Sequence, residues 1–192
     1  MAFDNSHLPE QTPDGEFAAP PKRANAPTGP IRKPIALWTG TSGIALLLST
    51  GFGIGYSPLA PGTLGAALGV GIYSALWRLG ALRITVPLVS AVLLAAGVHL
   101  ASIAERRFGE KDSPKIVLDE VASFPLTMLF ISPTWPRIAF AFAFHRAADI
   151  LKPFPAGRIQ KLKGGWGIML DDTMAAIYAN LLLRLAILVL RI

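Results

Sequence analysis

The sequence predicts an all-α protein: a compact, membrane-associated bundle of about six helices with a disordered N-terminal tail. Hydrophobic residues make up 52% of the 192 residues and charged residues only 16%. The mean hydropathy is +0.48, which is typical of a chain that contacts lipid. The apolar residues also fall into runs of helical length, separated by glycine, proline and charged residues.

Each predicted element has its own pattern. Residues 1–34 are rich in proline, glycine and polar residues and are expected to form the disordered tail, whereas residues 35–192 form the helical domain. Segment 64–77 is punctuated by glycine, which allows close packing on a neighbouring helix. Segment 84–104 carries no formal charge and exceeds the roughly 20 residues that cross a bilayer. The other helices are expected over residues 35–50, 121–131, 138–151 and 173–190.

Charge and cysteine content exclude several classes of function. The net charge is +6, but the basic residues are scattered and form no stripe with interleaved aromatic residues, so no nucleic-acid partner is predicted. Anionic lipid headgroups or phosphorylated substrates suit this charge better. The absence of cysteine excludes disulfides and a cysteine nucleophile. The N-terminus lacks a basic region followed by an apolar core, so no secretory signal peptide is predicted.

Four polar islands interrupt the apolar segments, at residues 51–65, 112–120, 145–155 and 163–172. If 64–77 and 84–104 form one helical hairpin, the first two islands lie at the same end of it. A second hairpin that turns at "SPTWPR" returns the third island to that end, and the fourth follows after a short loop. Hairpin topology therefore predicts that all four islands meet.

The islands hold carboxylates beside basic residues, which suits a hard cation such as Mg²⁺ with a phosphate group. Arg146, Asp149 and Lys152 are spaced to share one helix face. Gly51, Gly53 and the turn at 61–63 offer backbone N–H groups near a helix start, where anions bind. The candidate cation ligands are Asp119, Glu120, Asp149, Asp171 and Asp172.

Each feature also has a plainer interpretation. Asp119 and Glu120 are the kind of pair that complements a helix dipole, and Asp171 and Asp172 could cap the last helix. Lys152 could snorkel at a membrane surface. The glycines could serve only packing and turns. The functional interpretation is favoured because most mid-chain acids fall in these few islands, each beside glycine or a basic residue.

Together the islands resemble the phosphatidylglycerophosphatase A family. Its motifs match "GFGIGYSPLAPGTLG", "KIVLDE", "HRAADILKPFP" and "KGGWGIMLDD", in that order, over roughly residues 43–190. The resemblance implies a Mg²⁺-dependent phosphatase that converts phosphatidylglycerophosphate to phosphatidylglycerol. It also implies a phospholipid substrate in the bacterial inner membrane and an active site that faces the cytoplasm.

The resemblance implies a set of functional residues. The catalytic residues are Asp119, Glu120, Asp149, Lys152, Asp171 and Asp172, the five carboxylates among them being the metal ligands. The phosphate-binding residues are Arg146, Lys152, Gly51, Gly53, Gly62 and Thr63, with Pro61 shaping the loop. The chain departs from the motifs at His145, usually Phe; at Ala147 and Ala148, usually aromatic; and at Ser123, commonly Gly.

Other functions stay open at this point. A small membrane cation transporter or channel subunit predicts ionisable residues in the middle of spanning segments, whereas the acids here lie at segment ends. A related phosphatase acting on another phosphomonoester fits the same residues. A helical scaffold leaves the clustered acids unexplained. The sequence leaves the oligomeric state open.

Overall fold

The computed structural model describes residues 41–80 and 82–191. The predicted tail, and the first part of the 35–50 segment, lie outside these residues. The described part is helical and contains no β-strand, as predicted. Its elements are α1 (Thr41–Ser49), the 3₁₀ helix η2 (Ile54–Tyr56), α2 (Pro61–Arg78), α3 (Leu82–Phe108), α4 (Leu118–Thr127), α5 (Trp135–Leu151), α6 (Ala156–Ile159) and α7 (Gly165–Leu190).

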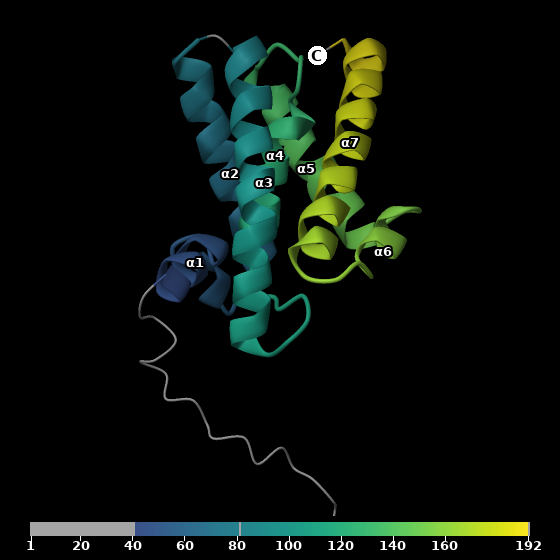
Figure 1. Ribbon diagram of the computed structural model, residues 1–192. Helices are drawn as coiled ribbons and strands as arrows, with labels where there is room; N and C mark the ends of the chain where they lie inside the picture. The colour runs from purple at the N-terminus through teal and green to yellow at the C-terminus, as the bar shows by residue number, and fades with distance from the viewer. Residues whose placement is uncertain (1–40, 81, 192) are drawn as a thin grey trace, which may run out of the picture. The chain divides into compact units, whose positions relative to one another are not determined.

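The helices alternate in direction as the hairpin argument requires. Figure 1 shows the end of α2, the start of α3, the α4–α5 connection and the end of α7 at one end of the helical unit. The start of α7, together with α1 and α6, lies at the opposite end. The short helix α4 is central, since it packs against α2, α3 and α7.

Five helices begin earlier than the sequence predicted: α2, α3, α4 and α5 by two or three residues, and α7 by eight. Helix α2 begins at Pro61, because proline lacks the N–H that a first turn leaves unpaired. Helix α7 begins at Gly165 rather than at residue 173. Asp171 and Asp172 are therefore inside α7, and the interpretation of these two residues as caps of the last helix is wrong.

Glycine lets α2 approach α4 closely, as predicted for segment 64–77. A Cβ atom on Gly65 would lie 2.8 Å from Val117 Cβ, and one on Gly69 would lie 2.8 Å from Phe124 Cβ. Real side chains do not tolerate such distances, so the two backbones pack through these glycines. This contact fixes the start of α4 beside the start of α2.

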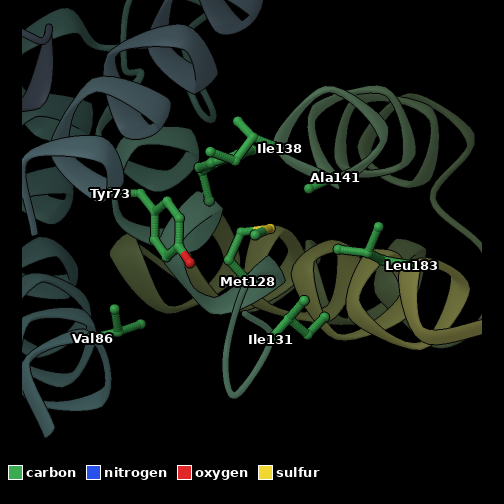
Figure 2. Close-up of a cluster of buried hydrophobic side chains, with 8 residues drawn as sticks. Tyr73, Val86, Met128, Ile131, Ile138, Ala141 and Leu183 are labelled. Carbon is green, nitrogen blue, oxygen red and sulfur yellow. The ribbon is translucent and has the colours of Figure 1, made fainter. Parts of the chain in front are cut away.

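Most of the apolar core lies in two clusters. Figure 2 shows the first, in which Tyr73, Met128, Ile138 and Leu183 from α2, α5, α7 and the end of α4 surround a common centre. Burying a side chain of this size stabilises the fold by about 1.5–3 kcal/mol. The second cluster joins α1, α3, α4 and α7 and consists of Leu46, Ala101, Ala104, Ile116, Ala122, Ile168 and Met169.

Two polar side chains of α7 close the C-terminal end of α4. The Asn180 amide donates to the carbonyls of Thr127 at 2.8 Å and Leu129 at 3.2 Å. Arg184 Nη2 donates to the Leu129 carbonyl at 2.9 Å. These bonds satisfy carbonyls that a helix end leaves free, and they explain the arginine that interrupts the final apolar segment.

By length and composition, two helices in the described residues are able to cross a membrane: Arg83–Phe108 within α3, and Gly165–Leu190, which is α7. The predicted 84–104 segment is thus part of a longer apolar helix. The final segment reaches the same length only because α7 includes the glycine-rich residues before Asp171.

Candidate active site

The four polar islands meet around one cavity of about 470 Å³. The start of α2, the loop before α4, the start of α4, the end of α5 and one residue of α7 contribute to it. Residues of all four islands therefore lie together, as the alternating directions of the helices predicted. The lining residues are Ala60, Pro61, Gly62, Thr63, Asp112, Ser113, Pro114, Ile116, Asp119, Glu120, Arg146, Asp149, Ile150, Lys152 and Asp172.

Three buried carboxylates line this cavity: Asp119, Glu120 and Asp172. One oxygen from each of Asp119, Glu120 and Asp172 lies within 4.8 Å of the others. Asp119 Oδ1, Glu120 Oε2 and Asp172 Oδ2 are buried and have no hydrogen-bond partner. Buried polar atoms are normally paired, so these three oxygens point to a ligand that supplies the missing interaction. We call these three residues the carboxylate trio.

The surroundings disfavour the charged form of the trio. Burial, followed by the charges of Glu120 and Asp172, raises the pKa of Asp119 well above its usual value. Burial also raises the pKa of Glu120, although Arg146 opposes this. A cation between the carboxylates would offset both effects, because it favours the charged form of each.

The other two candidate carboxylates already have cationic partners. Arg146 Nη1 lies 2.7 Å from Asp149 Oδ2 and 3.7 Å from Glu120 Oε1. Lys152 Nζ lies 2.5 Å from Asp171 Oδ2 and 4.0 Å from Asp149 Oδ1. Burial opposes the charged form of Lys152, but the hydrogen bond and charge of Asp171 outweigh it and raise the lysine pKa. The five carboxylates thus divide into Asp149 and Asp171, which hold cations at short range, and the trio, in which Glu120 alone has an ion pair, the longer one to Arg146.

Lys152 adopts a backbone conformation that positions it for this contact. It ends α5 with φ of 43°, in the left-handed region, and its N–H donates to the Ala148 carbonyl at 2.9 Å. Such a position usually favours glycine. A lysine there carries backbone strain, which is common where a side chain has a functional role.

The predicted glycine residues separate into two groups. A Cβ atom on Gly62 would overlap Glu120 Oε1 and lie 3.2 Å from Arg146 Nη2, so only glycine leaves both groups in place. Gly62 and Thr63 line the cavity in the first turn of α2, where N–H groups lack helical partners. Gly51 and Gly53 are not among the lining residues. They have positive φ angles and belong to the turns between α1 and η2.

Six lining residues were not among the predicted site residues, and Asp112 is the one that carries a charge. It accepts a hydrogen bond from Gln160 Nε2 at 2.5 Å. Its position in the same island as Asp119 was the available signal.

Two of the residues at which the chain departs from the family motifs, Ser123 and His145, share one buried hydrogen bond. Ser123 Oγ and His145 Nε2 are 2.9 Å apart, and both side chains are fully buried. Burial lowers the pKa of His145 to about 4, so the imidazole is neutral. The bond joins α4 to α5 beside Glu120 and Arg146.

Comparison with known proteins shows the family to which the chain belongs. The family model described as phosphatidylglycerophosphatase A matches residues 47–187. The chain belongs to this family. Its relatives include phosphatidylglycerophosphatase A of Haemophilus influenzae, which is 39% identical over 69% of this chain and 82% of that protein. The corresponding Escherichia coli protein is 31% identical over 68% of this chain and 76% of its own length.

A third relative has a different name. A Bacteroides thetaiotaomicron protein, provisionally named a phosphatidylinositol-3-phosphatase, is 37% identical over 74% of this chain and 93% of that protein. No solved structure gives a significant match to the chain. Membership of the family makes the chain a phosphoric monoester hydrolase, and all members of the carboxylate trio fall inside the matched range.

Proposed function

We propose that this chain removes the terminal phosphate of phosphatidylglycerophosphate in a Mg²⁺-dependent reaction that yields phosphatidylglycerol and inorganic phosphate. The observation that carries the proposal is the carboxylate trio, whose members have buried oxygens without a hydrogen bond and line a cavity together with Arg146 and Lys152. The names of the two phosphatidylglycerophosphatase relatives support this substrate.

The trio is the set of residues that would hold the cation. Carboxylate oxygens without histidine or cysteine are the ligands that Mg²⁺ prefers. Once bound, Mg²⁺ supplies Lewis-acid polarisation of phosphate oxygens. This assignment narrows the five predicted ligands to three, with Asp172 rather than Asp171 in contact with the cation.

The basic residues bind the phosphate in this proposal. Arg146 and Lys152 neutralise the charge that spreads over the phosphate oxygens in the transition state. Asp149 and Asp171 hold these two side chains in position, at 2.7 Å and 2.5 Å. The N–H groups of the first turn of α2 add uncharged donors. The attacking oxygen bonds to phosphorus as the P–O bond to the glycerol oxygen breaks. That oxygen takes up a proton to become the hydroxyl of phosphatidylglycerol, and the one water consumed overall supplies this proton and the fourth oxygen of the inorganic phosphate.

The attacking group is either water or one of the carboxylates. Rapid acid quenching with substrate labelled in its terminal phosphate distinguishes them. Acid-labile label on the protein identifies an aspartyl-phosphate, and its absence during turnover identifies water.

Asparagine variants test the metal assignment. Asp119→Asn and Asp172→Asn each remove one anionic oxygen with little change in shape, so we expect weaker Mn²⁺ binding by electron paramagnetic resonance and at least 10²-fold slower phosphate release. Glu110→Gln is the control, because Glu110 is exposed and does not line the cavity, and the glutamine keeps an oxygen that can accept the hydrogen bond from the lining residue Ser113. Normal Mn²⁺ binding and activity in both asparagine variants would exclude the trio as the site.

The proposed location is the bacterial inner membrane, with the cavity facing the cytoplasm. The two long apolar helices support membrane insertion. Cytoplasmic segments of membrane proteins carry an excess of lysine and arginine. Among the described residues, the α3–α4 and α5–α7 connections at the cavity end hold all the lysines: Lys111, Lys115, Lys152, Lys161 and Lys163. They also hold Arg158, whereas five arginines belong to the helix ends on the other side: Arg78, Arg83, Arg137, Arg184 and Arg191.

A second candidate function is removal of phosphate from another phospholipid headgroup. The name of the Bacteroides relative is the observation that favours it. Parallel assays with phosphatidylglycerophosphate and phosphatidylinositol 3-phosphate, at equal surface concentration in mixed micelles, decide between the two substrates.

A further inference from the structure

The outward faces of the two helices beside the cavity are almost entirely apolar. In α5 the exposed residues are Trp135, Pro136, Ala139, Ala143, Ala147, Ile150 and Leu151. In α2 they are Leu64, Ala67, Gly71, Ala75 and Arg78, and the arginine is at the end farther from the cavity. Apart from Arg78, the exposed residues of both faces are apolar, so water solvates neither face well.

The apolar faces continue to the edge of the charged cavity. Ile150 lines the cavity and is 70% exposed, between Asp149 and the end of α5. Leu151 follows it and is 78% exposed. On the α2 side, Leu59 is 77% exposed and precedes Ala60, the first lining residue. Leu64, at 43% exposed, follows the lining residue Thr63.

The polar interior of the cavity and its apolar edge together fit a ligand that has both a phosphate group and a hydrocarbon part. Arg146 and Lys152 complement a phosphate group, whereas the edge complements hydrocarbon. A soluble phosphomonoester would leave Leu59 and Leu151 in water. A second copy of this chain packed over Ile150 would cover a wall of the cavity. An acyl chain covers the same surface and leaves the phosphate inside.

We propose that Leu59, Leu64, Ile150 and Leu151 form an acyl-chain subsite, so that a phospholipid enters the cavity sideways from the bilayer, between the start of α2 and the end of α5. The inference rests on the proposed function and specifies how the lipid is held. It assigns the chains to the apolar edge and the head phosphate to Arg146 and Lys152.

Kinetics with two chain lengths test the subsite. The double variant Leu59→Gln/Leu151→Gln removes apolar contact at two exposed positions that are not part of the core. We expect kcat/KM for long-chain phosphatidylglycerophosphate to fall about tenfold or more through KM, and to fall less than threefold for the dihexanoyl substrate dissolved as monomers. Leu188→Gln is the matched control, since Leu188 is 76% exposed near the far end of α7. Equal losses on both substrates, or no loss on the long-chain one, would overturn the proposal.

A binding measurement separates this inference from the proposed reaction. Phosphatidylglycerophosphate with a photoreactive diazirine on one acyl chain is irradiated with the full-length protein in vesicles. Labelling at Leu151 should be competed by excess unlabelled phosphatidylglycerophosphate and not by phosphatidylcholine, whereas labelling at Leu188 should respond equally to both. Loss of this difference, or crosslinking of two protein copies through Leu151, refutes the subsite. Competed labelling without phosphate release would refute the reaction alone.

Discussion

Replacement of Gly62 by alanine tests the geometry of the site without changing its charge. The new methyl group would overlap Glu120 Oε1 and lie 3.2 Å from Arg146 Nη2. Real Cβ atoms essentially never lie within 3.0 Å of such atoms. The Glu120 carboxylate is buried beside Asp119, so it has to move within a confined space.

The size of the effect follows from the displacement. To reach an ordinary contact, the Glu120 oxygen must shift by on the order of 1 Å, and a misplacement of that size costs roughly 10²-fold in rate. Stability should change little, because alanine is the better helix former by about 1 kcal/mol and Glu120 ends in a flexible side chain.

The matched control is Gly71→Ala in the same helix. A Cβ atom on Gly71 would meet nothing within 4 Å. Phosphate release and thermal unfolding are measured for both variants in the same detergent. We expect Gly71→Ala to be as active as the parent and equally or more stable, and Gly62→Ala to unfold near the parent temperature with about 10²-fold lower activity. Full activity in Gly62→Ala would refute the placement of Glu120 in the reaction site.

Three further predictions concern strain, coupling and protonation. Lys152→Gly should be more stable than Lys152→Ala by about 1 kcal/mol in thermal unfolding, because glycine accepts the left-handed backbone. Both variants should lose phosphate release to about the same extent. Equal stability of the two variants would contradict backbone strain at Lys152. The unfolding free energy should fall by about 1–3 kcal/mol in each of the single variants Ser123→Ala and His145→Phe. The double variant should lose less than the sum of the two single losses, because both remove the same hydrogen bond. Additive losses would exclude coupling between the two side chains. In EDTA the raised pKa of Asp119 makes the folded state hold more protons than the unfolded state, so the unfolding free energy should fall as pH rises above about 4. Saturating Mg²⁺ should remove this contribution, and identical pH slopes with and without Mg²⁺ would contradict it.

The meeting of the polar islands could be predicted from the sequence because alternating helices return each island to the same end. The start of α7 could not be predicted from the sequence. The sequence predicted the last helix from residue 173, after the polar island at 163–172, whereas a Cβ atom on Gly165 would overlap the Val98 carbonyl. Gly165 is the first residue of α7 and allows the start of this helix to pack on α3.

The sequence alone also could not show which of the five candidate carboxylates belong to the trio and which hold Arg146 and Lys152. Asp171 and Asp172 are adjacent in sequence, yet a helix turns neighbouring side chains by about 100°. One therefore contacts Lys152 and the other lines the cavity. No spacing rule distinguishes the two, because the outcome depends on where α5 ends. The pairing of Ser123 with His145 likewise depends on how α4 and α5 pack.

The most direct test of the central claim is phosphate release from phosphatidylglycerophosphate by the purified protein in mixed micelles. The account predicts release in the presence of Mg²⁺, loss of release in EDTA and recovery when Mg²⁺ is added in excess. Release that continues unchanged in EDTA, or no release with Mg²⁺ present, would contradict it.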